Sequence, residues 1–582
     1  MNNANDKLIT ATAATIHRSF EDYNDEFRRI TQRAPRRFEE REWKLGQRDA
    51  VERIDLYDRK IHSCVAGLVG PMGSSIADQA TWGRVRSEYS SLIADCVDSE
   101  FYKTFFNSLT RKVFNTVGVN PKVEYLAPDL EPTVNGSAPP LHTFDVDSGI
   151  EPIVRSIIEQ FPSADRFRDR DGAIEHVVAE ISEFSGVRHA GCPIRQVEML
   201  APVFYRATRA FCVGRIYGDG WIAPLVLAFM NTEDGIVVDA VMMHDTDVRS
   251  LFGFSRSYFQ VDLPAVGAAV RVLSSVMPTK PTGELYTVLG RAKQGKTERY
   301  RRMFKHLSES NDEFVHAEGE RGMVMIAFTL RDYGLIFKVI RDHFAPPKQT
   351  TRANVMERYQ FVFKHDRVGR LVDAQEYRRL RFRASLFTAK LREELLTQAV
   401  ETCRLEGDDL IIEHSYIERK LRPLNLYLQE ADALEACRAV VDYGQAVKDL
   451  ARSNVFPGDL LVKNFGVTST GRIIFYDYDE LCLVTDCVFR DLPTARFEED
   501  EMRAEPWFYV GTADVFPEQF ANFLGFSPDQ RRAFMAEHAD LLTADYWRKI
   551  KARHEADELL EVVPYADRSR YMRFSNPARS TD

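Results

Sequence analysis

The most informative segment of the sequence is Asp459-Leu-Leu-Val-Lys-Asn464, followed after a turn by Ile473-Ile-Phe-Tyr-Asp477-Tyr-Asp479. Asp459 offers a carboxylate that can accept or orient a hydroxyl proton, and Asn464 offers an amide oxygen suited to a hard cation. Asp477 follows a run of β-branched and aromatic residues, so we expect its carboxylate to emerge from the end of a strand. The stretch therefore predicts a site that holds a divalent cation beside a proton acceptor.

An acid, an amide and a second acid in this order are typical of the catalytic base and metal ligands of a kinase-like fold. The Asp-x-x-x-x-Asn pattern alone occurs often by chance, and an ordinary surface loop is the alternative. Lys463 lies between the acid and the amide, where it could neutralise charge on a phosphoryl group or remain solvated. Phosphoryl transfer is the leading hypothesis from these residues.

Upstream, a pair of glycines and a strand lysine fit the same chemistry. The glycines within 317–322 would let backbone N–H groups approach phosphates, although a plain turn would use glycine equally well. Lys338 is the one charge in the apolar run 335–340, which suits pairing with nucleotide phosphates and an acidic helix residue. The alternative is an edge-strand lysine that prevents aggregation. Spacing suggests Glu357, on the next predicted helix, as the acidic partner.

Length and patterning predict an α+β protein of two domains. The 582 residues exceed what a single hydrophobic core usually organises. Apolar residues within 16–30 recur at helical spacing, which predicts an amphipathic helix in a mostly helical N-terminal domain. A loop rich in Pro, Asp and Gly is expected over 128–149, and a strand over 235–242.

The second half predicts a small β-rich lobe followed by a helical lobe. Apolar runs over 323–330 and 335–340 surround a short turn and predict a β-hairpin. We expect a helix over 351–364, a strand pair around 410–421 and a helix over 434–453. A nucleotide would lie in the cleft between these two lobes.

Composition excludes several classes of function. The formal net charge of −10 disfavours a nucleic-acid binder. The closest of the eight cysteines, Cys482 and Cys487, fit neither a zinc knuckle nor a Cys-x-x-Cys motif, a pattern that suits a reducing cytoplasm. No His-Glu-x-x-His or Gly-x-Ser-x-Gly motif is present and the histidines do not pair at metal-ligand spacing, so neither zinc nor serine-hydrolase chemistry is expected. The longest apolar stretches are about half the ~20 residues of a membrane-spanning helix, so no membrane segment is expected.

A competing motif begins at Gly290. Gly290-Arg-Ala-Lys-Gln-Gly295-Lys296-Thr297 matches the Walker A pattern letter for letter, and residues 285–289 before it could form a strand. A P-loop NTPase that uses Lys296 is therefore an alternative function. However, no strand with a second acidic metal ligand follows at βαβ spacing, and the region does not alternate strands and helices. We interpret the match as a coincidence.

Longer blocks of sequence carry a family resemblance. They include Phe456-Pro-Gly-Asp459, Lys463-Asn-Phe-Gly-Val467 and Phe475-Tyr-Asp-Tyr-Asp-Glu480, together with 252–259, 321–325, 337–340, 365–370 and 416–419. With these blocks the chain resembles, over nearly its whole length, the isocitrate dehydrogenase kinase/phosphatase family of bifunctional bacterial enzymes.

The resemblance implies a regulatory domain over 1–310 and a bilobal protein-kinase-like catalytic domain over 311–582. Such an enzyme phosphorylates a serine of isocitrate dehydrogenase with ATP and also dephosphorylates it, which controls flux between the citric acid cycle and the glyoxylate bypass. Hydrolysis of ATP to ADP is expected as well. The resemblance further implies Mg²⁺ or Mn²⁺, AMP as an allosteric effector and isocitrate dehydrogenase as the protein partner, and leaves a homodimer open.

The family's pattern also assigns residues. Those that would contact ATP are Ala317, Glu318, Gly319, Glu320, Arg321, Gly322, Met323, Lys338, and the hinge residues Tyr416, Ile417, Glu418 and Arg419. The catalytic and metal-binding residues would be Asp459, Asp373, Lys463, Asn464 and Asp477. In this pattern Asp459 is the kinase base, Asn464 and Asp477 hold the metal, and Asp373 serves chiefly the phosphatase activity.

The chain departs from ordinary protein kinases in two places. Pro457-Gly458 stands where His-Arg usually precedes the catalytic Asp, and Asp477-Tyr-Asp479 replaces Asp-Phe-Gly. Both departures agree with the resembled family, whereas Glu357 has no secure counterpart in it. A third hypothesis is a non-catalytic nucleotide-binding module, but such a module would not need the strand lysine together with the full set of acids and amide.

Overall fold

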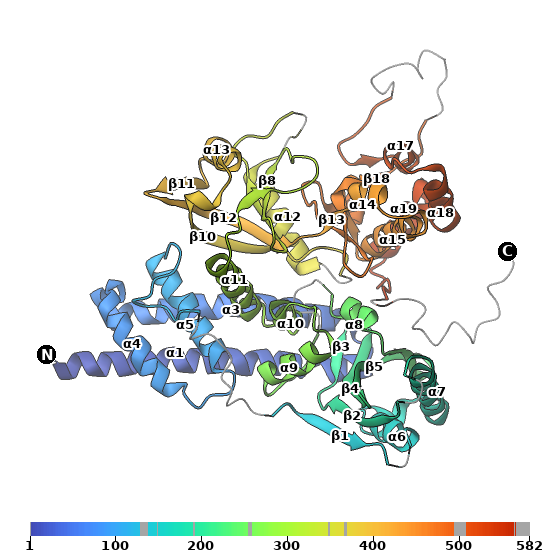
Figure 1. The fold of residues 1–582 in the computed structure, drawn as a ribbon, viewed down its shortest axis with the longest axis horizontal. Helices are drawn as coiled ribbons and strands as arrows, with labels where there is room; N and C mark the ends of the chain where they lie inside the picture. Colours follow the sequence, from blue (N-terminus) through green and yellow to red (C-terminus); the bar gives the residue numbers. More distant parts are fainter. Residues whose placement is uncertain are drawn as a thin grey trace. The chain divides into compact units, whose positions relative to one another are not determined.

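The computed structural model describes residues 2–127, 138–147, 149–189, 192–253, 259–346, 348, 350–365, 369–493, 508–563 and 565. These residues divide into two compact units, one before residue 311 and one from Asn311 onward (Figure 1). Tyr565 belongs to the first unit, although the sequence places it in the range expected for the second domain. Half of the predicted loop 128–149, and parts of the blocks 252–259 and 365–370, lie outside the described residues. Within the described half, Leu141–Asp145 forms a strand that the prediction of a loop did not include.

The first unit begins with the predicted amphipathic helix, which extends over Asn2–Thr31. Phe20, Tyr23 and Phe27 on its apolar face are buried, and this helix packs against α3 and α4. The helices of this unit are α1 (Asn2–Thr31), α2 (Ala34–Glu39), α3 (Trp43–Met72), α4 (Gln79–Leu92), α5 (Ser99–Phe114), α6 (Glu151–Glu159), α7 (Arg170–Arg188), α8 (Asp245–Leu251), α9 (Val266–Val276), α10 (Thr282–Val288) and α11 (Ala292–Glu309).

The first unit also contains a six-stranded antiparallel sheet in the order β1-β2-β4-β5-β6, with β3 paired to β4. The strands are β1 (Leu141–Asp145), β2 (Ile194–Leu200), β3 (Phe204–Arg206), β4 (Arg209–Gly218), β5 (Trp221–Thr232) and β6 (Gly235–Met242). The strand predicted over 235–242 is thus confirmed as β6. Helices α6 and α7 bury Ile157, Ile174 and Val177 against this sheet, which forms a mostly apolar core.

The Walker-like segment does not form a P-loop. Residues 285–288, expected as the strand of that alternative, lie in helix α10 instead. Lys296 and Thr297 lie inside α11, and the Thr297 hydroxyl donates to the carbonyl of Lys293. A Cβ on Gly295 would lie 2.4 Å from the carbonyl oxygen of Gly283, so this glycine serves the close packing of α10 on α11. The coincidence interpretation is therefore supported by the fold.

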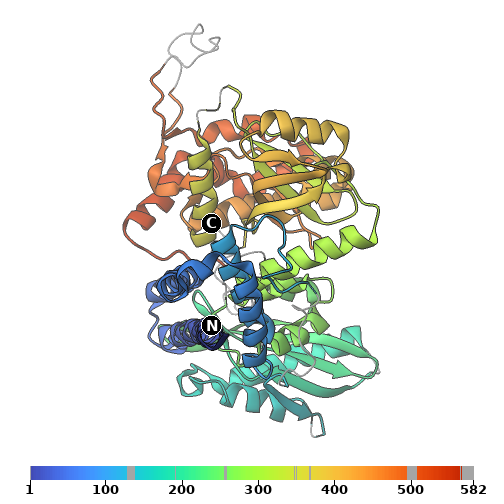
Figure 2. The ribbon, with the colours of Figure 1, turned by 90° about the vertical axis from the view of Figure 1, so that its left-hand side faces the viewer.

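The second unit starts with a six-stranded antiparallel sheet in the order β10-β12-β9-β8-β7, with β11 paired to β12 (Figures 1 and 2). Its strands are β7 (Phe314–His316), β8 (Met325–Leu330), β9 (Leu335–Ile340), β10 (Gln375–Arg383), β11 (Cys403–Glu406) and β12 (Asp409–Arg419). Helices α12 (Arg352–His365) and α13 (Ala389–Gln398) accompany it. The predicted hairpin is confirmed as β8 and β9, and the helix predicted over 351–364 as α12.

The strand pair predicted around 410–421 is wrong, because β12 is one strand of 11 residues. The tight turn lies earlier, at Gly407, whose φ of +62° favours glycine. It connects β11 to β12. One edge of β12 pairs with β11 and then with β9, and the opposite edge pairs with β10.

A helical lobe completes the second unit. Its helices are α14 (Leu424–Glu430), α15 (Ala433–Arg452), α17 (Phe520–Phe523), α18 (Pro528–His538) and α19 (Ala544–Glu555). Its short strands are β13 (Arg422–Pro423), β14 (Val455–Phe456), β15 (Phe465–Val467), β16 (Ile473–Phe475), β17 (Cys482–Leu483), β18 (Val488–Phe489) and β19 (Asp514–Val515). The helix predicted over 434–453 is confirmed as α15. In the part of the chain that the structure describes, no helix is both long and apolar enough to cross a membrane.

Candidate active site

A cavity of about 440 Å³ opens in the second unit, a volume typical of ligand pockets. Its wall comes from the β7–β8 loop, from β8 and β9, from the chain after β12 and from the segments around β14 to β16. Of the predicted site residues, those that line it are Ala317, Glu318, Gly319, Glu320, Arg321, Gly322, Met323, Lys338, Glu418, Arg419, Asp459, Lys463, Asn464 and Asp477. Segments up to 160 residues apart in sequence therefore meet at one cavity.

The loop between β7 and β8 forms one edge of this cavity. Gly319 has a φ of +100°, a conformation that favours glycine. A Cβ on Gly322 would lie 2.9 Å from a carbonyl oxygen of β8, so a larger residue would displace the loop. Glu320 forms an ion pair of 2.6 Å with Lys463, which ties the loop to the segment that carries Asp459. Glycine at positions 319 and 322 therefore allows the loop backbone to take the path that it follows along the cavity.

Lys338 is held by a carboxylate that the sequence analysis placed in the hinge. Its Nζ lies 2.7 Å from Glu418 Oε1 and donates to the carbonyl of Tyr476 at 2.7 Å. Both side chains are buried, so each charge needs its partner. The expected partner, Glu357, is exposed on α12, and that prediction is wrong. The reason is sheet register: Tyr416 lies opposite Lys338, which places Glu418 diagonally on the same face.

Only the second half of the predicted hinge lines the cavity. Tyr416 and Ile417 are interior residues of β12 and do not line the cavity, whereas Glu418 and Arg419 do. The Tyr416 ring is fully buried and stacks on Tyr359 of α12, with ring centroids 3.9 Å apart. The part of this segment that reaches the cavity is therefore the end of β12 and the residues after it, to Asn425.

Asp459 follows β14 in a turn that its own side chain stabilises. Its Oδ1 accepts hydrogen bonds of 2.8 Å from the Leu461 N–H and from the Asn464 side-chain amide. The preceding Gly458 has a φ of +85°, and a Cβ there would lie 2.5 Å from Glu480. Glycine at this position lets the turn pack against the chain after Asp477. The carboxylate that could accept a proton and the amide that could bind a cation are therefore adjacent.

Asp477 is positioned by a short hairpin of β15 and β16. Phe465 pairs with Phe475, which brings the residues just outside the hairpin, Asn464 and Tyr476, together through a backbone hydrogen bond of 3.0 Å. Asp477 follows directly and lines the cavity. Amide and carboxylate oxygens are the donors that Mg²⁺ and Mn²⁺ prefer, so Asn464 and Asp477 could hold such an ion.

A buried arginine fixes the other end of that hairpin. Arg370 is 3% exposed and binds Asp442 at 2.7 Å, Asp449 at 2.8 Å and the Ile473 carbonyl at 2.9 Å. Burial alone would lower the pKa of Arg370, but the charges of Asp442 and Asp449 raise it overall. Because Ile473 starts β16, this network sets where the strand that leads to Asp477 begins.

The carboxylates of the site repel one another. Burial raises the pKa of Asp459, and the charge of Asp477 adds to this effect, although the hydrogen bond from the Leu461 N–H opposes it. Burial and the charge of Asp477 also raise the pKa of Asp479 to about 7. A cation bound among these groups would relieve the repulsion. A carboxylate with a raised pKa is also a better proton acceptor.

Asp373 does not line the cavity. It is 8% exposed, and its Oδ2 accepts a hydrogen bond of 2.9 Å from Gln375. Its neighbour Val372 accepts a hydrogen bond of 2.6 Å from the hydroxyl of Tyr478, between Asp477 and Asp479. Asp373 therefore follows directly after a residue that binds the acidic turn through the hydroxyl of Tyr478.

Comparison with known proteins gives matches over most of the chain. The regulatory-domain model of the isocitrate dehydrogenase kinase/phosphatase (AceK) family matches residues 13–311, and its kinase-domain model matches residues 312–567. The chain belongs to the isocitrate dehydrogenase kinase/phosphatase family. Proteins of that name from Xanthomonas campestris pv. campestris (strain 8004) and Anaeromyxobacter dehalogenans are each 45% identical to it, over 567 and 588 residues. The alignments cover 97% of both chains in the first case, and 98% of this chain and 99% of the relative in the second.

Two cavity residues of this isocitrate dehydrogenase kinase/phosphatase family member were not among the predicted site residues. Asp479, in the acidic turn, lines the cavity. Lys348 also lines it, and its Nζ lies 2.5 Å from Glu480 Oε1. Burial alone would lower the pKa of Lys348, but the Glu480 pair raises it overall. Nothing in the local pattern around Lys348 distinguishes it from a surface lysine.

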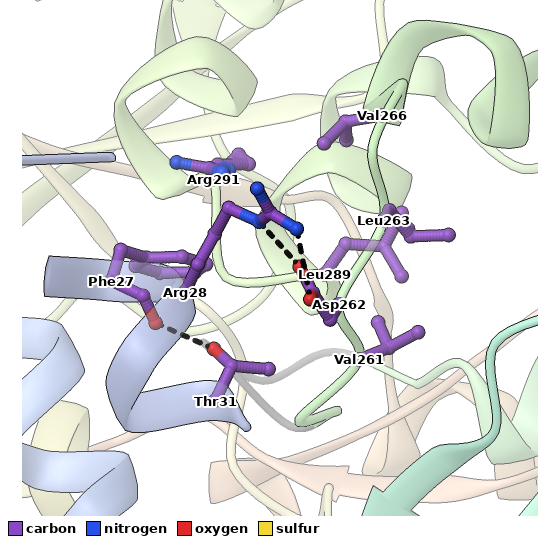
Figure 3. Close-up of a pocket in the computed structure, with 9 residues that line it drawn as sticks. All are labelled: Phe27, Arg28, Thr31, Val261, Asp262, Leu263, Val266, Leu289 and Arg291. Carbon is purple, nitrogen blue, oxygen red and sulfur yellow. Dashed lines mark hydrogen bonds and ion pairs between the residues drawn. The ribbon is translucent and has the colours of Figure 1, made fainter. Parts of the chain in front are cut away.

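A much smaller cavity lies in the first unit of this family member (Figure 3). Its volume is about 10 Å³, which has room for about one water. Arg28 closes one side by donating to both oxygens of Asp262, at 2.8 and 3.1 Å. This cavity does not accommodate a nucleotide, so the 440 Å³ cavity of the second unit is the candidate active site.

Proposed function

We propose that this chain is an enzyme that transfers the γ-phosphoryl group of ATP to a serine of isocitrate dehydrogenase and also hydrolyses the resulting phosphoserine. Its effect would be to control flux between the citric acid cycle and the glyoxylate bypass. The observation that carries the proposal is the meeting of Lys338 with Glu418, and of Asp459, Asn464 and Asp477, around one 440 Å³ cavity in a member of this family.

Each residue has a role in the kinase reaction. Lys338, held by Glu418, binds nucleotide phosphates, and the β7–β8 loop covers them with backbone N–H groups. Asp459 accepts the proton of the substrate serine, which its raised pKa favours. Asn464 and Asp477 would hold Mg²⁺ or Mn²⁺, which would neutralise charge on the phosphoryl group. When a nucleotide is bound, Lys463 would exchange its contact with Glu320 for one with the phosphoryl group and stabilise the negative charge there.

The phosphatase reaction needs a water oriented toward phosphoserine, with the same cations stabilising the transferred group. Asp373 is proposed to serve this reaction as a positioning residue. Its support is the hydrogen bond from Tyr478 to Val372, through which a change at residue 373 would move the turn of Asp477 and Asp479. One cavity would then carry out both reactions.

We assign regulation to the first unit and catalysis to the second. The assignment is supported by the match of residues 13–311 to the family's regulatory domain and of 312–567 to its kinase domain. AMP would bind the first unit and shift the balance between the kinase and phosphatase activities. The enzyme would act in the cytoplasm. Such coupling requires AMP to bind two conformations of the enzyme with different affinity.

The experiment incubates the purified chain with Mg²⁺, γ-labelled ATP and isocitrate dehydrogenase, and then adds unlabelled ADP and AMP. We expect label to enter the dehydrogenase and then to leave it as free phosphate. Hydrolysis of ATP without label on the dehydrogenase would contradict the substrate assignment.

Two variants separate the reactions. Asp459→Asn should lower kinase activity by about two to four decades, whereas Asp373→Asn should lower mainly phosphatase activity. The control is Asp408→Asn, because this aspartate lies in a turn with a side chain that is 93% exposed. Equal loss of both activities in the two site variants would contradict the division of roles.

A further inference from the structure

Three groups that commonly bind transition metals meet in the first unit, away from the cavity described above. His17 and Glu21 lie one turn apart on α1, and Cys96 lies in the connection between α4 and α5. The His17 Nε2 is 4.0 Å from Glu21 Oε1 and 3.9 Å from Cys96 Sγ, and all three donor atoms lie within 4.8 Å of one another. Zinc chemistry was not expected from the sequence because these three residues form neither a histidine pair nor a local cysteine motif.

The spacing is close to that of a metal centre. In a tetrahedral site with Zn–N near ~2.0 Å and Zn–S near ~2.3 Å, ligand atoms lie about 3.3–3.6 Å apart. The observed distances of 3.9 and 4.0 Å exceed these values by about 0.3–0.7 Å, a difference that side-chain rotation can close. The side chains of His17 and Glu21 are 26% and 40% exposed, so an ion can enter from solvent and retain a water as fourth ligand.

The surroundings orient these ligands. The hydroxyl of Tyr102, on α5, donates to Glu21 Oε1. The His17 ring stacks on the Tyr102 ring, with centroids 5.6 Å apart, and its edge meets Tyr89 at 6.5 Å. Aromatic packing and a hydrogen bond thus restrict the imidazole and the carboxylate, as outer contacts do in metal sites.

The local charge favours a cation. The carboxylates of Glu21 and Asp95 both lie near the Cys96 thiol. A divalent cation would replace the thiol proton and balance these negative charges.

We propose that His17, Glu21 and Cys96 form a binding site for a zinc-class divalent ion, with water at the fourth position. Thiolate and imidazole select Zn²⁺ over Mg²⁺, in contrast to the all-oxygen pair Asn464 and Asp477 of the second unit. On binding, the Sγ–metal bond replaces the S–H bond, and the proton passes to solvent. The ion would join α1 to the α4–α5 connection and stabilise the first unit.

The test titrates the full-length chain with Co²⁺ in excess Mg²⁺, which occupies oxygen sites but gives no thiolate signal. We expect one equivalent of Co²⁺ to produce a sulfur-to-cobalt charge-transfer band and the visible bands of a four-coordinate ion, both removed by Zn²⁺. Cys96→Ser should abolish the charge-transfer band and weaken binding by at least about 100-fold. Cys437→Ser, a partly buried cysteine of the second unit, is the matched control and should retain the band.

A second variant keeps the test decisive if Cys96→Ser folds poorly. Glu21→Gln changes a partly exposed side chain and should keep the thiolate band while weakening Co²⁺ binding by at least about tenfold. Zn²⁺ should also raise the unfolding temperature of the unaltered chain but not that of Glu21→Gln at the same concentration. No thiolate band with the unaltered chain, or equal affinity in Glu21→Gln, would overturn the proposal.

Discussion

An ion pair is buried within the six-stranded antiparallel sheet of each unit, and the comparison separates a structural pair from a functional one. In the first unit Arg209 Nε lies 2.7 Å from Asp239 Oδ2, and the side chains are 2% and 0% exposed. In the second unit Lys338 Nζ lies 2.7 Å from Glu418 Oε1, and the side chains are 10% and 4% exposed. Distance and burial are almost the same, so neither can reveal which pair takes part in chemistry.

The surroundings of the two pairs differ. The hydroxyl of Tyr565 accepts a hydrogen bond of 2.8 Å from Arg209 and donates one to Asp239, and its ring is buried, so the first pair is sealed. Lys338 and Glu418 both line the 440 Å³ cavity. A sealed pair can only contribute to stability, whereas an accessible lysine can exchange its carboxylate contacts for those of a phosphate. Access to the cavity, rather than the degree of burial, therefore distinguishes the functional ion pair from the structural one.

The largest effect is expected when the sealed pair is broken. Asp239→Ala leaves the Arg209 guanidinium buried without its carboxylate, and should lower the free energy of unfolding by about 3–5 kcal/mol. Chemical denaturation measures the change, and hydrogen exchange of the β4 and β6 amides locates it. Asp171→Ala is the control, because Asp171 binds Arg155 at the surface and its loss should change stability by less than about 1 kcal/mol. Similar losses of stability in the two variants would mean that a buried ion pair contributes no more to stability here than a surface one.

Breaking the accessible pair should change the rate of reaction instead. Lys338→Met removes the cation from the phosphate site, and we expect kcat for phosphorylation of the dehydrogenase to fall by about 10²–10³-fold. The loss of stability should be smaller than for Asp239→Ala, because Glu418 faces a cavity that water can enter. Lys390→Met, at an exposed position on α13, should leave kcat unchanged. A folded Lys338→Met enzyme with full activity would contradict the function assigned to this pair.

The sequence predicts those parts of the fold and site that depend on neighbouring residues. The helical spacing in 16–30 predicts α1, and the apolar runs on both sides of residue 332 predict the β8–β9 hairpin. Both predictions succeed because periodicity and turn chemistry are local properties. The segment from Asp459 to Asn464 is likewise recognisable because its turn is stabilised by its own side chains.

The remaining features depend on register and on contacts between distant segments. Glu418 holds Lys338 from 80 residues away, and only the pairing of β12 with β9 places it there. A prediction based on proximity along the chain chose Glu357 instead. Lys348 and the meeting of His17 with Cys96 were missed for the same reason, because neither has a local pattern.

A third test concerns a buried carboxylate of the first unit. Glu100 is 2% exposed on α5, and burial together with the charge of Asp98 raises its pKa from 4.5 to about 7. The folded chain therefore retains a proton that the unfolded chain has released between these pH values, so stability falls as pH rises through this window. Glu100→Gln should remove this loss of stability with pH. The variant should have a free energy of unfolding up to about 3 kcal/mol higher than that of the unaltered chain at pH 8, and no higher at pH 4.

Unfolding curves at both pH values measure the difference. The control is Glu159→Gln, at an exposed position near the end of α6, which should show the same stability as the unaltered chain at each pH. A gain for Glu100→Gln that is equal at pH 4 and pH 8 would contradict the raised pKa. Kinase activity should not change with Glu100→Gln, because a sealed group of the first unit takes no part in the reaction.

The smallest effect is expected for the carboxylate that holds Lys338. Glu418→Gln keeps the shape of the side chain but replaces a charge-assisted hydrogen bond by a neutral one, so Lys338 is positioned less firmly. The loss of about 1.5–3 kcal/mol of transition-state stabilisation corresponds to roughly a 10- to 100-fold fall in kcat/KM for phosphorylation. Glu357→Gln should leave kcat/KM unchanged, because Glu357 is exposed on α12. If Glu357→Gln were the more damaging of the two, the helix glutamate would be the partner during turnover, and the pairing of β12 with β9 would describe only the resting enzyme.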